Sequence, residues 1–140
     1  MKLTLKEVNE KYLGLADLGK LVLPIKLSYA VAKNIDTLQP HVERIEKERK
    51  KLCEQYAKKD EDGNPKMIKS IVGGQERSNY DMDPGEQQAM NKEYEDFLET
   101  EEVDVEIRKV KLSLIEECEK DRYNIPNVAN QTALMFMLEE

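Results

Sequence analysis

One helical stripe constrains this chain more than any other feature of its sequence. In residues 24–59 the side chains that share the stripe recur at alternating intervals of four and three, and they are Val31, Ile35, Leu38, Val42, Ile45, Arg49, Leu52 and Tyr56. This spacing keeps a stripe on one face of a helix and turned toward a partner helix. We therefore predict a long amphipathic helix over residues 24–59, with the other segments covering its stripe.

Two prolines mark the start and the middle of this helix. Pro24 fits the first turn, where its missing N–H would have no partner in any case. Pro40 lies inside the stripe, where it removes one hydrogen bond and clashes with the carbonyl of Asp36. We expect a kink or a one-turn break near residues 34–38.

The charge pattern predicts which segment packs against the distal half of the helix. Residues 41–59 contain seven basic and four acidic side chains, whereas residues 83–106 contain ten acidic side chains and one basic side chain. Asp83, Pro84 and Glu86 form a helix-start pattern, so we predict a returning helix over residues 83–100. Opposite charges beside an apolar seam favour an antiparallel pair. A solvated acidic face without a specific partner is the alternative.

Both ends of the chain are expected to be helical. Thr4 and Glu7 form a capping box, and an amphipathic helix follows, ends near Gly19 in a left-handed turn and leads into a connector that completes residues 1–23. Gly14 inside this helix indicates either close packing or a tolerated flaw. Asn127 caps a second helix over residues 127–139.

The last helix ends in five consecutive apolar residues. This segment, Leu134 to Leu138, is either buried against the proximal half of the long helix or forms a contact surface. Leu134, Phe136 and Met137 are therefore candidate contacts to a partner.

The remaining segments predict a small β element. Residues 103–114 alternate apolar and polar side chains and change phase near Arg108, which is typical of a strand with a bulge. A lone strand needs a partner, either residues 67–72 or another subunit, and the second choice would make the chain a homo-oligomer. Residues 60–66 are a turn without the ligand spacing of a calcium loop, and residues 73–82 are expected to be a loop.

These expectations define a fold class. The chain is predicted to be mainly α, an elongated helical hairpin of a kinked long helix and an antiparallel acidic arm, with flanking terminal helices and a small β element. Its 140 residues form a single domain, 1–140, because two separate cores would each be marginal.

Composition disfavours several classes of function. A formal net charge of −7 opposes direct nucleic-acid binding, which depends on neutralising phosphates with Lys and Arg. Cys53 and Cys118 lack the spacing of a zinc site and are expected to be free thiols. Without a phosphate-binding loop, a nucleophile elbow or a second histidine beside His41, we expect no enzyme activity, no cofactor and no metal. No segment is apolar enough to predict a membrane span.

Part of the sequence resembles a loose group of small accessory proteins from phages and prophages of Gram-positive bacteria. The resemblance rests on a Leu-Pro-x-Lys-x-(Ser/Ala)-Tyr-x-(Ile/Val/Leu)-Ala-Lys-Asn stretch, on a later Tyr-x-x-Lys-Asp-Glu-x-Gly stretch and, more weakly, on the Met-rich last 15 residues. Here the matching residues are Leu23, Pro24, Lys26, Ser28, Tyr29, Val31, Ala32, Lys33, Asn34, Tyr56, Lys59, Asp60, Glu61 and Gly63. Residues 68–82 fall outside the shared pattern. The resemblance implies a phage accessory protein in the cytoplasm of an infected bacterium, without assigned catalytic residues.

Three functions follow as hypotheses. The first is a non-catalytic phage protein that binds and inhibits or sequesters a host component, most simply a host protein of an antiviral defence system. The second is a virion-assembly or tail-associated structural protein. The third is a sponge for a small signalling nucleotide, for which Arg44, Arg49 and Lys51 would supply a basic pocket, expected at a subunit interface.

Overall fold

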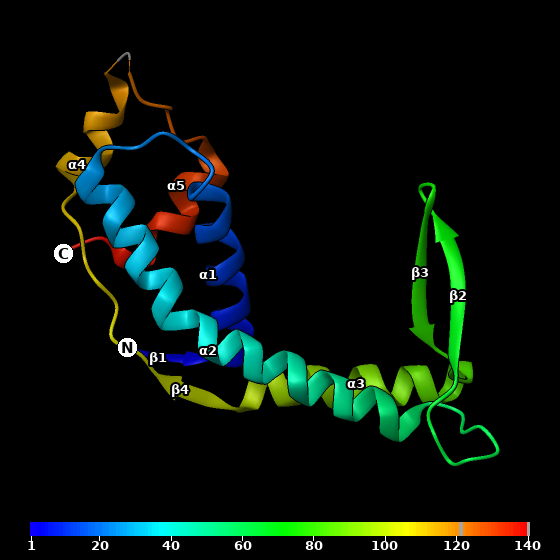
Figure 1. Cartoon of the computed structure of the whole chain (residues 1–140). Coiled ribbons are helices and arrows are strands. Elements are labelled where there is room, and N and C mark those ends of the chain that lie inside the picture. Colours follow the sequence, from blue (N-terminus) through cyan, green and yellow to red (C-terminus); the bar gives the residue numbers. More distant parts are fainter. Residues whose placement is uncertain (121, 140) are drawn as a thin grey trace. The chain divides into compact units, whose positions relative to one another are not determined.

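The predicted long helix is present as α2 (Ile25–Tyr56) in the computed structural model, which describes residues 1–120 and 122–139 (Figure 1). Every residue of the stripe is buried or half-buried, as its spacing predicts. The helix continues through Pro40, so the predicted one-turn break is wrong, while a kink stays a prediction. Pro24 precedes the first turn, and its carbonyl accepts the backbone N–H of Ser28 at 2.9 Å.

The described chain divides into two compact units, residues 1–43 with 100–140 and residues 44–99. The prediction of one domain over residues 1–140 concerns folding as a unit, and it stays a prediction. The first unit contains β1 (Lys2–Thr4), α1 (Leu5–Leu18), the proximal half of α2, β4 (Glu102–Asp104), α4 (Leu112–Glu116), η1 (Glu117–Glu119), α5 (Val128–Leu134) and η2 (Met135–Met137). The second contains the distal half of α2, β2 (Met67–Val72), β3 (Gln75–Tyr80) and most of α3 (Pro84–Thr100).

Helix α1 begins as its capping box predicts. The Thr4 hydroxyl accepts the Glu7 N–H at 3.2 Å, and the Glu7 carboxylate accepts the Thr4 N–H at 3.1 Å. The bond from the Thr4 backbone lowers the pKa of Glu7, because it stabilises the charged form. Gly19 follows the helix with a φ of −62°, so the predicted left-handed turn is wrong.

The core of the first unit lies between α1, α2 and α5. Leu15, Leu27 and Leu134 are fully buried in it. Asn127 and Asn130 form a capping box that starts α5. The predicted helix over residues 127–139 is shorter, since its α-helical part ends at Leu134 and continues as η2.

The predicted strand over residues 103–114 is wrong in most of its length. Only β4 is a strand, and it pairs antiparallel with β1, with Val103 opposite Leu3. Residues 105–111 are extended but belong to no strand of either sheet, and α4 follows them. The apolar residues change phase near Arg108 because those on its two sides are buried against different neighbours. Val105 is buried next to the β1–β4 sheet, and Val110 is buried against the C-terminal segment.

The second unit contains the predicted helix pair. The Tyr56 hydroxyl donates to Glu93 at 2.8 Å, and Lys58 pairs with Asp83 at 3.3 Å, so α3 runs beside the distal half of α2 (Figure 1). These partners raise the pKa of Tyr56 and that of Lys58, because each favours the protonated form.

A β-hairpin occupies the segment between these two helices. The loop expected over residues 73–82 is wrong, because Gln75–Tyr80 forms β3 and pairs antiparallel with β2. The strand predicted over residues 103–114 was expected to pair with residues 67–72 or with another subunit, whereas among the described residues β4 pairs with β1 and β2 pairs with β3. Residues 60–66 form the predicted turn, in which Asp60 accepts the backbone N–H groups of Asp62 and Asn64, both at 2.9 Å.

Candidate functional site

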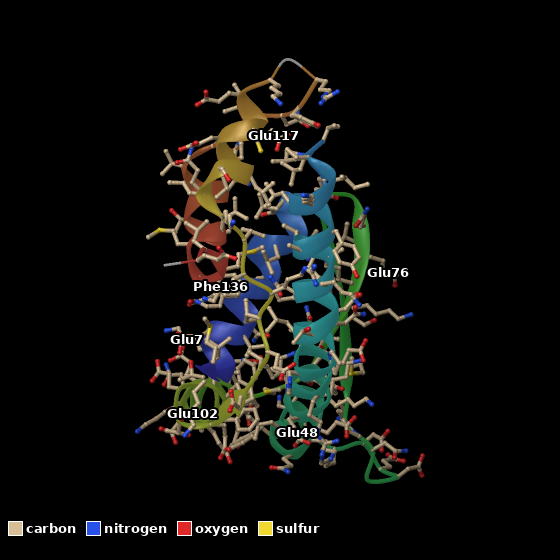
Figure 2. All side chains as sticks on the ribbon, turned by 90° about the vertical axis from the view of Figure 1, so that its left-hand side faces the viewer. Glu7, Glu48, Glu76, Glu102, Glu117 and Phe136 are labelled. Carbon is tan, nitrogen blue, oxygen red and sulfur yellow. The ribbon has the colours of Figure 1, made fainter. Side chains whose placement is uncertain are left out.

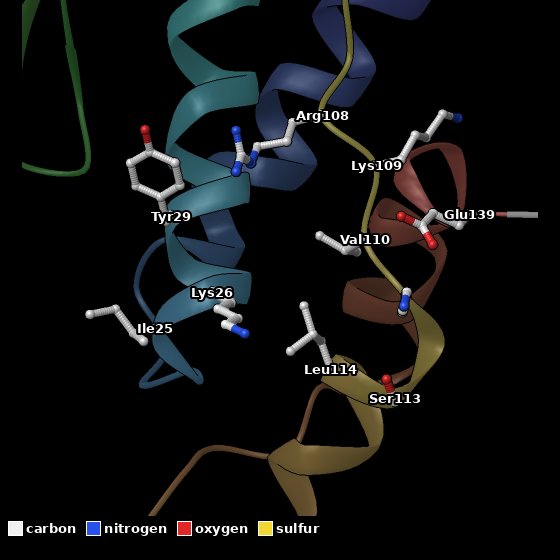
Figure 3. A pocket seen from close by; sticks show the side chains of 10 residues that line it. Ile25, Lys26, Tyr29, Arg108, Lys109, Val110, Ser113, Leu114 and Glu139 are labelled. Atoms are coloured by element: carbon white, nitrogen blue, oxygen red, sulfur yellow. The ribbon is translucent and has the colours of Figure 1, made fainter.

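A pocket of about 720 Å³ lies in the first unit, between the first turns of α2 and residues 108–114 (Figure 3). Its volume falls within the range of ~300–1,000 Å³ that is typical of small-molecule sites. The residues that line it are Ile25, Lys26, Tyr29, Arg108, Lys109, Val110, Lys111, Ser113, Leu114 and Glu139.

The extended segment beside the pocket is held in place by Asn34 of α2. The Asn34 side chain accepts the Arg108 N–H at 2.8 Å and donates to the Arg108 carbonyl at 3.1 Å. Asn34 is 1% exposed and is the buried polar residue of the described core. Its amide thus pairs with the backbone of Arg108 as a neighbouring strand would, and this leaves the Arg108 side chain exposed.

The C-terminal segment holds the other side of the same stretch. The Val110 N–H donates to the Met137 carbonyl at 2.8 Å, and the Glu139 N–H donates to the Val110 carbonyl at 2.8 Å. Val110 and Leu138 form a parallel bridge. Residues 108–110, which form one wall of the pocket, are therefore held by contacts to two elements.

The pocket combines an apolar floor with a basic rim. Val110 is buried and Leu114 half-buried, and both side chains point toward Lys26 across the pocket (Figure 3). Four of the lining residues are basic, Lys26, Arg108, Lys109 and Lys111, and one is acidic, Glu139. This balance contrasts with the net charge of −7 for the whole chain.

The basic side chains of the rim differ in how they are held. The Arg108 guanidinium lies 5.0 Å from the centre of the Tyr29 ring, a cation–π contact that orients it over the pocket. Lys109 donates to the Phe136 carbonyl at 2.6 Å and points away from Tyr29 (Figure 3). Lys26 and Lys111 form no ion pair with any described residue. Lys26 lies in the first turn of α2, where the helix dipole is positive and no acidic residue compensates it.

The basic residues predicted as ligand contacts lie elsewhere. Arg44, Arg49 and Lys51 belong to the distal half of α2 and do not line this pocket. Arg44 and Lys51 both pair with Glu48, at 3.2 and 3.5 Å, and Arg49 pairs with Glu46 at 2.6 Å. The hydrogen bond to Glu46 raises the pKa of Arg49. Each of these cations thus has an ion-pair partner within its own helix, with Glu48 shared between Arg44 and Lys51.

The apolar residues predicted as partner contacts are mostly inaccessible. Leu134 and Met137 are 0% exposed, so in this structure neither is available to a partner, and burial is the correct alternative for these two residues. Met135 of the same segment is 66% exposed. Phe136, which is labelled in Figure 2, is half-buried. The Lys11 ammonium lies 5.0 Å from the centre of its ring.

Sequence reasoning missed the pocket because its two walls are about 80 residues apart in the chain. In the sequence, Lys26 and Tyr29 stand out only as members of the phage-like stretch. One local signal was available, since the acidic segment that ends at Glu106 gives way to Arg108, Lys109 and Lys111. The alternation of these residues predicted a strand instead, so the cluster of basic side chains did not indicate a site.

The two cysteines are free thiols, as predicted, and both are buried. Burial raises the pKa of the Cys118 thiol, because it disfavours the thiolate. We expect neither thiol of the folded protein to react readily with an aromatic disulfide reagent at pH 8, and two equivalents to react in denaturant. Rapid reaction of either thiol in native buffer would contradict this expectation, and the denatured chain serves as the reference.

Two further observations concern the described residues as a whole. No cluster of three or more His, Cys, Asp or Glu side chains among them could hold a metal ion. None of the helices in the described ranges is both long enough and apolar enough to span a membrane.

In comparisons with known proteins, the chain matched no family model, no curated protein and no solved structure.

Proposed function

We propose that this chain is a non-catalytic phage accessory protein that sequesters a small anionic host molecule in the basic pocket of its first unit. The observation that carries the proposal is a basic rim around an apolar floor in a chain whose net charge is −7. Its phage origin rests on the resemblance of the first part of the sequence. The proposal combines the first hypothesis, sequestration of a host component, with the third, binding of a small signalling nucleotide.

The geometry supports a ligand that combines an anionic group with a planar or apolar part. Lys26 and Lys111 supply positive charge without an ion-pair partner among the described residues, so a bound anion need not displace a carboxylate from either ammonium group. Glu139 is the acidic residue of the lining. Val110 and Leu114 supply the apolar contact, and the guanidinium of Arg108 offers a planar face for stacking. A nucleotide has this combination, and a signalling nucleotide of the host is our leading candidate.

Calorimetric titration with a panel of nucleotides, including cyclic dinucleotides, tests the proposal. The variant Lys26→Glu/Lys111→Glu should weaken binding at least tenfold, because it reverses two charges of the rim. The matched control Lys47→Glu/Lys50→Glu makes the same charge change on exposed positions of α2 outside the pocket. It should change affinity less than twofold, since distant exposed charges are screened by salt.

Three outcomes would overturn the proposal. The first is the absence of heat with every nucleotide in the panel. The second is an equal loss of affinity in the pocket variant and in the control, which would indicate nonspecific electrostatic attraction. The third is binding confined to an acidic peptide containing leucine, used as a comparison ligand, because the site would then recognise protein rather than a small molecule.

A further inference from the structure

The β2–β3 hairpin buries none of its side chains in the described chain. All positions of β2 and β3 are exposed except Ser70 and Tyr80, which are half-buried. A two-residue turn at Gly73 and Gly74 joins the strands, and both glycines have positive φ, 61° and 79°. Isolated two-stranded sheets are at best marginally stable in water. The hairpin therefore has unpaired edges that another strand can extend.

Apolar side chains lie on both faces of β2. Successive residues of a strand point to opposite faces, so Met67 and Ile71 share one face, and Ile68 and Val72 share the other. Ile71 is 80% exposed. The opposite strand β3 has no aliphatic residue and contains Glu76 and Arg77. The apolar surface of the hairpin thus belongs to one strand and to both of its faces.

This distribution favours a partner strand over a partner layer. A helix or sheet packed against one face of β2 would leave the apolar residues of the other face in water. A strand added beside β2 contacts neighbours on both faces at once and also pairs the open backbone edge. The turn makes Val72 and Gln75 a hydrogen-bonded pair, so the backbone groups of Met67, Lys69 and Ile71 point to the open edge.

We propose that the partner strand is β2 of a second copy of this chain, giving a four-stranded antiparallel sheet with β2 and its copy at the centre. When β2 pairs antiparallel with β2 of a second copy about a two-fold axis, one residue of β2 lies at the axis, opposite the same residue of the copy. The pair is centred on that residue. Centring on Lys69 would oppose two like charges, which destabilises a sheet. Centring on Ser70 places Ile68 opposite Val72 of the copy, and Lys69 opposite Ile71 of the copy.

The charge of the hairpin also fits a second copy. The whole chain carries −7, so two copies repel each other over most of their surface. Residues 67–80 contain Lys69 and Arg77 against Glu76, and this part is therefore slightly positive. Contact at the hairpin brings two copies together where neither is negative. This inference does not depend on the pocket or its ligand.

Sedimentation equilibrium over a concentration series tests the dimer. The wild-type mass should rise from 16.3 kDa toward twice that value as concentration increases. Ile71→Lys should raise the dimer dissociation constant at least tenfold, because it opposes a second lysine to Lys69 of the copy. Within the chain the new lysine faces Glu76, so the hairpin itself should be retained. Ile125→Lys alters an exposed isoleucine in the other unit and should leave association unchanged.

A charge swap tests the register. In Lys69→Glu/Ile71→Lys the glutamate of each copy should face the lysine of the other, and association should return to within about threefold of wild type. A mass of 16.3 kDa at every wild-type concentration would overturn the inference. Equal weakening by Ile71→Lys and Ile125→Lys would also overturn it, as would failure of the charge swap to restore association.

Discussion

Replacing Asn34 with alanine is expected to lower the free energy of unfolding by about 2–4 kcal/mol, the largest effect of any single polar substitution that we foresee in this protein. Asn34 makes two hydrogen bonds to the backbone of Arg108, and its side chain also lies 3.5 Å from the Met137 sulfur. Alanine would leave both backbone groups of Arg108 without these partners, in a region where Asn34 itself is 1% exposed. Unpaired buried groups cost more than the net value of a hydrogen bond.

Urea unfolding followed by circular dichroism measures this effect. The midpoint should fall while the dependence on denaturant stays the same, because the surface exposed on unfolding hardly changes. Asn34→Leu fills the same space without hydrogen bonds and should be similarly destabilised, which separates lost bonds from a cavity. Asn91→Ala on an exposed position of α3 is the matched control and should change stability by less than about 0.5 kcal/mol. Equal effects at Asn34 and Asn91 would contradict the role assigned to Asn34.

The same substitution links stability to the pocket. Asn34 fixes the backbone from which the Arg108 side chain extends, and Arg108 forms one wall of the pocket. At a urea concentration far below the unfolding midpoint, Asn34→Ala should still weaken nucleotide binding by more than Asn91→Ala does. Asn34 is therefore a positioning residue, since it lines no part of this pocket itself.

Elements whose cause is local could be predicted from the sequence. The capping box at Thr4 and the helix cap at Asn127 depend on residues three positions apart, and both are present. The stripe of α2 depends on helical periodicity alone, and its inward orientation is confirmed. The pairing of α3 with α2 followed from complementary charge, although Arg44, Arg49 and Lys51 pair within α2.

Elements whose cause is distant in the chain could not be predicted. Residues 105–111 are extended because Asn34 and the C-terminal segment hold them, and neither contact leaves a periodic pattern in the sequence. The alternation there was mistaken for a strand. Strand β3 was missed because its side chains are polar on both faces, whereas the Gly73–Gly74 pair is a hairpin signal that could have indicated it. The pocket combines residues of α2 with residues of that extended segment, so the sequence could not predict it either.

Substitution of Gly14 by leucine is expected to lower the free energy of unfolding by about 2–3 kcal/mol. Gly14 lies in α1 where α5 crosses it, and a Cβ atom added there would lie 2.8 Å from the Ala133 Cβ. That separation is shorter than any normal carbon–carbon contact, and Ala133 has no flexible side chain that could move aside. Gly14 thus permits the close packing that was one of two interpretations of its position.

Gly85 is the matched control for this substitution. It also lies in a helix, the first turn of α3, and a Cβ atom added there meets no atom within 4 Å. Because glycine disfavours helix by about 1 kcal/mol, Gly85→Leu should leave stability unchanged or raise it slightly. Thermal or urea unfolding of the two leucine variants therefore separates close packing from helix propensity. Equal stability of both variants would contradict close packing at Gly14.

A reciprocal pair of small substitutions tests the contact directly. Gly14→Ala should destabilise by about 1–2 kcal/mol, since the clash exceeds the gain in helix propensity. Ala133→Gly alone should also destabilise, by about 1 kcal/mol, because it places a glycine inside α5. The double variant exchanges the methyl group between the two helices, so its loss should be smaller than the sum of the single losses by at least about 1 kcal/mol. Simple additivity would show that the two residues do not meet, and the packing of α1 against α5 would then need a different cause.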